Sequence, residues 1–262
     1  FALIVISLIG SAAEPAYSLT LAENGEPAAA IVLGRHPDPV AFEAAQELQR
    51  VIRRISGATL PIYLENEWHG GSEGPRRNTN RIFVGDSQIA RDAGLDVSEL
   101  PPEGFVIKTT MFAPTRASPE GYYSPPTNRF RVLILAGRDD PKQNHQWRGD
   151  RSTRYLRGTA YAVYAFLEED LGVRWLWPGE EGEVVPRMKT IVVEPNDRTD
   201  APKLPKRNFR NNTGYWTGHI WQARGKVGTP LPVWTRLAYE SDRWLDHLRM
   251  GDSTDSILPL DS

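Results

Sequence analysis

The stretch HPDPVAFEAAQELQRVIRRISG, residues 36–57, constrains the fold more strongly than any other part of the chain. Its apolar side chains recur at intervals of three, four and seven residues, the pattern of one stripe on an amphipathic helix. Both ends are marked, because Asp38 can cap the N-terminus, Pro39 suits the first helical position, and Gly57 can adopt the left-handed conformation that ends a helix. The sequence therefore predicts a helix with one buried face.

Short apolar segments bounded by Gly, Pro and Asn surround this helix and predict strands. They cover residues 17–25, 28–34, 60–65, 81–85, 104–110, 130–137 and 190–195. A short helix capped by Ser87 is expected at 87–94, and the apolar segment 157–172 predicts a buried helix capped by Thr159. The order of these elements predicts an α+β fold with one mixed β-sheet and helices packed on it.

Residues 1–17 combine the apolar run FALIVISLIG with small residues typical of a cleavage zone. The run has the length of a signal-peptide apolar region and is too short to span a bilayer. A buried first strand is the alternative. We interpret these residues as a signal-peptide remnant and expect a protein that is secreted, periplasmic or at the cell surface, without an integral membrane segment.

Three further divisions of the chain are expected. Residues 18–196 would form the α+β domain, and the charged, Pro-rich residues 197–206 a linker. Residues 207–262 are too few to bury a core of much size, so they predict the incomplete start of a second domain.

Composition excludes several classes of function. The net charge of -2 over 262 residues gives no electrostatic basis for binding nucleic acid. Cysteine is absent, and the five histidines form no metal-binding spacing, so we expect no metal site and no cofactor. Asp139 and Asp140, which follow a predicted strand, are the alternative site for a cation.

The stretch GVRWLWPGEEGEVVP, residues 172–186, brings two tryptophans close to many carboxylates. Glycoside hydrolysis needs two carboxyl groups facing each other across a sugar. The consecutive acids 168–170 diverge on a helix, and glutamates in the PGEEGE turn are expected to be solvated. We therefore favour a structural corner, in which Trp175 and Trp177 pack the end of the helix against the sheet and Arg174 offsets the acids.

Segment 207–224 combines guanidinium groups with aromatic faces, which suits the hydroxyls and the apolar C–H face of a sugar. The candidate substrate-binding residues are Arg207, Arg210, Trp216, His219, Trp221 and Arg224. Packing between two domains is an equal alternative for these residues.

The segments AAQELQRVIRRISGATLPI, RIFVG and RGTAYAVYAFLEEDLGVRWLWPGEEGEVVP resemble the N-terminal α+β domain of alpha-glucuronidases and beta-N-acetylhexosaminidases. In these glycoside hydrolases the domain is not catalytic, and a (β/α)8 barrel follows it. KLPKRNFRNN resembles the start of the first barrel strand, with Arg210, or Arg207 in the other register, matching an arginine that points at the substrate.

The resemblance implies the non-catalytic N-terminal part of a secreted glycoside hydrolase that degrades polysaccharide. Its catalytic carboxylates would lie outside this chain, so the chain would be inactive alone. Its partners would be a poly- or oligosaccharide and its own downstream barrel. A carbohydrate-binding or cell-surface module without hydrolytic activity is the alternative.

Overall fold

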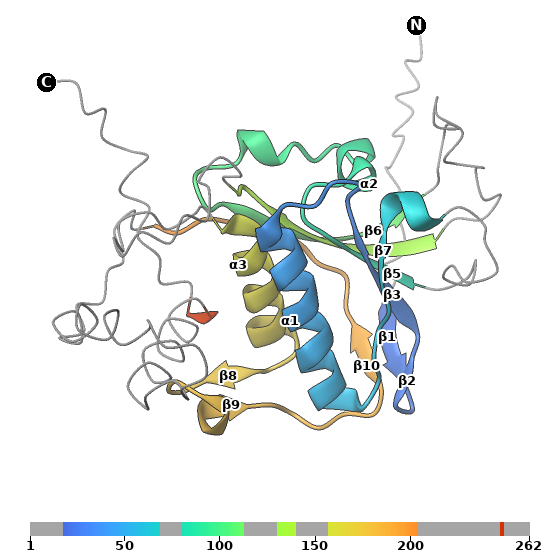
Figure 1. The fold of residues 1–262 in the computed structure, drawn as a ribbon, viewed down its shortest axis with the longest axis vertical. Helices are drawn as coiled ribbons and strands as arrows, with labels where there is room; N and C mark the ends of the chain where they lie inside the picture. Colours follow the sequence, from blue (N-terminus) through green and yellow to red (C-terminus); the bar gives the residue numbers. More distant parts are fainter. Residues whose placement is uncertain (1–17, 69–79, 113–129, 140–156, 204–246, 249–262) are drawn as a thin grey trace, which may run out of the picture.

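The computed structural model describes residues 18–68, 80–112, 130–139, 157–203 and 247–248. Figure 1 shows them as one layered unit, with helices against a sheet. The helices are α1 (Pro39–Ser56), α2 (Gln88–Asp92) and α3 (Gly158–Ala165), and a π-helical turn, Phe166–Asp170, continues α3. Single 3-10 turns cover Glu65–Trp68, Val97–Glu99 and Glu180–Gly182.

The largest sheet has six strands in the order β11-β6-β7-β5-β3-β4. The strands β4, β3, β5 and β7 run parallel, whereas β6 and β11 are antiparallel to their neighbours. Their bounds are β3 (Ala29–Leu33), β4 (Ile62–Leu64), β5 (Asn80–Val84), β6 (Phe105–Phe112), β7 (Phe130–Gly137) and β11 (Asp197–Asp200). The expected mixed sheet with helices packed on it is therefore present.

The expectation of a single sheet was wrong. Three other strands, β1 (Leu19–Glu23), β2 (Glu26–Pro27) and β10 (Ile191–Val193), form a separate antiparallel sheet. A third pair, β8 (Arg174–Trp175) with β9 (Glu183–Val184), forms a short hairpin. Apolar patterns predicted β1 and β10 but not their pairing, because it joins segments as distant as Leu19 and Val193.

The main helix α1 forms as the sequence predicts. The side chain of Asp38 accepts a hydrogen bond from the backbone N–H of Ala41 at 2.8 Å, and Gly57 ends the helix with φ of 90°. Leu48 and Ile52 on the apolar stripe are completely buried.

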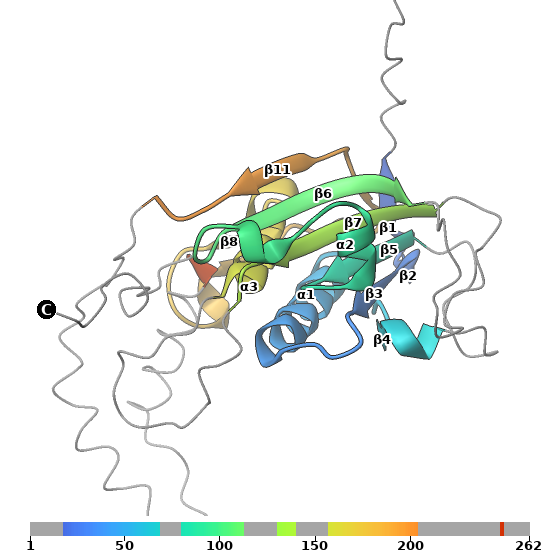
Figure 2. The same cartoon turned by 90° about the horizontal axis from the view of Figure 1, so that it is seen from above.

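The two faces of the large sheet are covered unequally. Figure 2 shows α1 and α3 together against one face of the sheet. The side chains of Ile82 and Val84 join these helices in the main core, whereas Phe83 between them joins Ile89 of α2 in a smaller cluster on the other face. This alternation follows the period of two in a strand.

The helix α3 is capped differently from the prediction. Thr159 lies inside the first turn, where its backbone N–H donates to the carboxylate of Asp139 at 2.9 Å. The hydroxyl of Thr159 accepts from the backbone N–H of Gly137 at 3.2 Å. The cap is therefore supplied by Asp139, which follows β7, so the assignment of Thr159 as the cap was wrong.

Residues 197–200, which composition places in a linker, form β11 at the edge of the large sheet. Arg198 pairs with Asp170 at 2.7 Å, and Asp197 pairs with Lys108 of β6 at 3.1 Å. Charged side chains are common on edge strands, where they oppose pairing with other chains. A charged segment can therefore be a strand here.

Candidate functional site

The carboxyl ends of the parallel strands are the first place where this fold could bind a ligand. The chain passes from β3 to α1 on one face of the sheet, and from β5 to α2 on the other. Loops that diverge in this way leave a crevice where open α/β sheets commonly bind ligands.

Acidic side chains of this chain occupy the helix N-termini at this edge of the sheet. Glu65 accepts hydrogen bonds from the backbone N–H groups of Gln88 and Ile89 at 3.2 Å each, at the start of α2. Asp38 and Asp139 cap α1 and α3 in the same way. The helix N-termini that could attract an anionic ligand therefore already hold carboxylates.

The loop from β3 to α1 and the loop from β5 to α2 also touch each other. A Cβ atom at Gly34 would lie 2.3 Å from the backbone oxygen of Asp86, so these backbones are in direct contact. Together with the acidic caps, this contact makes the edge a poor site for a phosphate or a nucleotide.

Two of these acids have raised pKa values. Burial raises the pKa of Glu65, and the bonds from Gln88 and Ile89 only partly offset it. Burial, with the nearby charge of Asp38, raises the pKa of Asp139 to about 7. Within the described ranges no group of three or more potential ligands gathers to hold a metal ion. Asp140, the other half of the alternative cation site, lies outside them.

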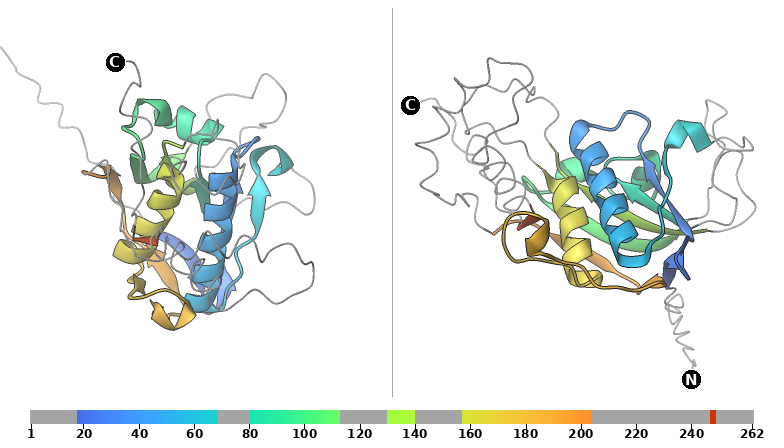
Figure 3. Two further views of the ribbon diagram at one scale, coloured as in Figure 1. Left: turned by 60° about the vertical axis from the view of Figure 1, so that its left-hand side comes forward. Right: turned by 60° about the horizontal axis from the view of Figure 1, so that its bottom comes forward.

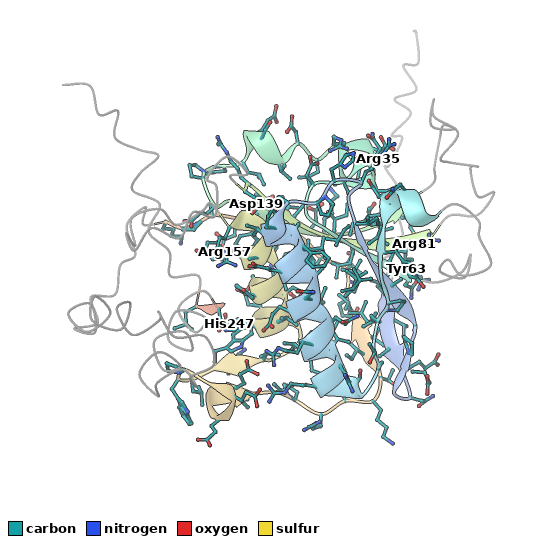
Figure 4. All side chains as sticks on the ribbon, in the orientation of Figure 1. Arg35, Tyr63, Arg81, Asp139, Arg157 and His247 are labelled. Atoms are coloured by element: carbon teal, nitrogen blue, oxygen red, sulfur yellow. The ribbon has the colours of Figure 1, made fainter. Side chains whose placement is uncertain are left out.

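A second location lies where α1, α3 and the β8–β9 hairpin meet. Here His247, from the segment that follows the domain, is 4% exposed and lies 3.0 Å from the Glu47 carboxylate on α1. Its ring stacks on Trp175 of β8, with centroids 4.6 Å apart and planes 2° apart, and meets Tyr164 of α3 edge-on at 4.7 Å. We call Glu47, Tyr164, Trp175 and His247 the His247 cluster; Figure 4 shows His247 beside the helix pair, toward the hairpin.

Ion pairs hold the hairpin against the helix beside this cluster. Arg50 contacts Glu47 at 2.7 Å and Glu183 of β9 at 2.9 Å. Arg54, one turn further along α1, also pairs with Glu183. Figure 3 shows the hairpin beside the pair of helices α1 and α3.

The charges in this network stabilise one another. Burial alone would raise the pKa of Glu47, but hydrogen bonds with Arg50 and His247 outweigh it and hold that pKa well below its ordinary range. Burial likewise would lower the pKa of Arg50, yet the bonds to Glu47 and Glu183 raise it above its ordinary value. Both groups are therefore ionised at neutral pH.

The aromatic and acidic stretch around Trp175 is thus built as a corner. Trp175 is 5% exposed, as predicted, but Trp177 is 52% exposed, so the prediction that both tryptophans pack inward was wrong for Trp177. The expectation of solvated glutamates was wrong for Glu183, which two arginines bind. Arg174 donates to the backbone carbonyl of Glu168 at 2.6 Å, and Asp170 pairs with Arg198.

The predicted substrate-binding residues cannot be placed on this architecture. All six, Arg207, Arg210, Trp216, His219, Trp221 and Arg224, lie outside the described residues. The sequence prediction did not include Glu47 or His247. The sequence offered one signal for this site: Glu47 lies beside the apolar stripe of α1, and Arg50, a possible ion-pair partner, follows three residues later.

Comparisons with known proteins found similarity among solved structures. No family model and no curated protein matches the chain. Among solved structures it is similar to a family GH115 4-O-methyl-alpha-glucuronidase with specificity for decorated arabinogalactans, with a TM-score of 0.42 and 16% identity. The match covers 88% of this chain and 25% of that enzyme, so the chain spans about a quarter of its length. This likeness is too distant to assign an activity.

Proposed function

We propose that residues 18–203 are a non-catalytic N-terminal accessory domain of an exported glycoside hydrolase, and that the α1–α3 face holds the polypeptide that follows. The His247 cluster is the observation behind the second part. A histidine two hundred residues beyond Glu47 is buried between two aromatic rings and a carboxylate of this domain.

The described carboxylates support a structural role for the domain. A glycosidase site places two carboxyl groups about 5 to 10 Å apart around an open sugar-binding cleft. Here Glu47 and Glu183 are bound by arginines, and Asp170 is bound by Arg198. Glu65 and Asp139 cap helices.

The glycoside hydrolase class is supported by the sequence segments at 44–62, 81–85 and 157–186, which resemble the first domain of alpha-glucuronidases and beta-N-acetylhexosaminidases. On this proposal the catalytic barrel is the domain's partner, and a polysaccharide is the substrate of the whole protein. Export is proposed from residues 1–17. In the described part of the chain, the helices are too short or too polar to span a membrane.

Hydrogen exchange of the 262-residue chain tests the docking. Replacing His247 with Ala should speed amide exchange in α1 and in the β8–β9 hairpin, because both lose a buried partner. His36→Ala, which changes an exposed histidine, is the matched control. Equal exchange in the two variants would contradict the proposal.

Calorimetry with xylan oligosaccharides separates this function from a carbohydrate-binding module. If the domain is an accessory domain, titration of the intact chain with these oligosaccharides should give no heat of binding. Micromolar binding would favour the carbohydrate-binding module. Release of sugar from an aryl glucuronide by this chain alone would contradict a non-catalytic role.

A further inference from the structure

The outer side of the β8–β9 hairpin carries an exposed apolar surface that the His247 cluster does not use. Trp175 pairs with Glu183 across the hairpin, and both side chains face α1 and α3. Leu176 and Trp177, which follow Trp175, and Val184, which follows Glu183, are instead exposed. We call Leu176, Trp177 and Val184 the outer hairpin face; they are 54%, 52% and 49% exposed.

This surface is concentrated and preformed. Six large apolar side chains are exposed among the described residues, and three of them lie on this hairpin. The backbone N–H of Leu176 donates to the carbonyl of Gly182 at 2.9 Å, and a Cβ atom at Gly182 would lie 1.9 Å from the carbonyl oxygen of Trp177. Such close contact fixes the backbone of the hairpin at Trp177, so a partner that docks here need not order that backbone.

Acidic groups border the apolar surface. Glu180 and Glu181 at the tip of the hairpin are exposed. An apolar patch with a charged rim is typical of a protein interaction site. The partner it fits has aromatic or apolar groups and positive charge.

One segment of this chain has that composition. Residues 204–230 contain five cationic side chains and no Asp or Glu, with four aromatic residues among them. The cations are Lys206, Arg207, Arg210, Arg224 and Lys226, and the aromatic residues are Phe209, Tyr215, Trp216 and Trp221.

Residues 204–230 belong to a longer stretch, 204–246, and both ends of that stretch are attached to this domain. Its start follows β11, and its end leads into His247, which stacks on the inner side of the same hairpin. We propose that the outer hairpin face is the docking surface for residues 204–230, which extends the interface of the His247 cluster and rests on the proposed function. The arginines of the segment would stack on Trp177 and pair with Glu180 and Glu181.

Chymotrypsin digestion of the intact chain, with cleavage sites identified by mass spectrometry, tests this docking. Trp177→Ala should raise the rate of cleavage after Phe209 and Trp216 roughly tenfold, as expected when a docked segment loses an aromatic anchor. Phe42→Ala removes an aromatic residue of similar exposure, 45%, from α1 and should leave that rate unchanged. Equal rates in both variants would overturn the proposal.

Charge reversal gives a second test that does not depend on Trp177. Changing Glu180 and Glu181 to Lys should also speed this cleavage, and changing Arg207 and Arg210 to Glu in that variant should slow it again. Failure of this rescue would overturn the charge pairing.

Two further outcomes identify a different occupant. A dimer that sedimentation detects and that Trp177→Ala dissociates would assign the surface to a second copy. Binding of xylan oligosaccharides that Trp177→Ala abolishes would assign it to carbohydrate. Either result overturns the proposal. If His247→Ala loosens α1 but Trp177→Ala leaves cleavage unchanged, only this inference fails and the proposed function stands.

Discussion

The carboxylate of Asp139 should make the stability of this domain fall as pH rises from about 4 to 7. Asp139 follows β7 and caps α3, and burial together with the charge of Asp38 raises its pKa from 3.8 to about 7. Arg157 and the Thr159 amide favour the ionised form but do not restore the ordinary pKa. Between these two values the folded state keeps a proton that the unfolded state has lost, so each unit of pH lowers the free energy of unfolding.

The size of the effect follows from that difference. A change from 3.8 to about 7 corresponds to about 4 kcal/mol. Water reaches part of this side chain, so we expect about half of that, ~2 kcal/mol. Asp139→Asn keeps an acceptor for the Thr159 amide and stays neutral. Its free energy of unfolding should therefore equal that of the wild type near pH 4 and exceed it by ~2 kcal/mol near pH 8.

Urea unfolding followed by circular dichroism at pH 4, 6 and 8 gives the free energy of unfolding of the wild type and of Asp139→Asn. Taking the difference between them removes the contributions of the other carboxylates. Asp92→Asn, an exposed change on α2, is the control. A difference that is constant with pH, or that grows as pH falls, would refute the reasoning.

Two further changes test the network and the carboxyl edge. Glu47→Gln should lower the free energy of unfolding by about 1 to 3 kcal/mol, because it weakens a buried charge network while Arg50 keeps Glu183. Glu43→Gln, also on α1 but 58% exposed, should cost less than about 1 kcal/mol in the same urea titration. Gly34→Ala places a methyl group against the Asp86 backbone and should cost more than about 2 kcal/mol by thermal unfolding, where a loss under 1 kcal/mol would contradict the close contact.

The sequence predicted elements whose signals are local. The helix α1 carries its own cap in Asp38, its own end in Gly57 and a regular stripe between them, so every part of the prediction lies within twenty residues. Ser87, which caps α2, is equally local. These were confirmed because helix periodicity and capping depend on neighbouring residues.

The elements that sequence reasoning missed depend on distant partners. Asp139 caps α3 from another element, and Asp197–Asp200 become a strand because β6 offers an open edge. Likewise Glu47 and His247 are in contact although two hundred residues separate them in the sequence. No window of neighbouring residues contains both members of such a pair.

A double-mutant cycle between Glu47 and His247 tests most directly whether the downstream segment docks on this domain. The free energy of unfolding is measured for the intact chain, for Glu47→Ala, for His247→Ala and for both together. Docking predicts a coupling of about 1 kcal/mol or more, since the two side chains share one buried contact. Losses that add to within about 0.5 kcal/mol would contradict it.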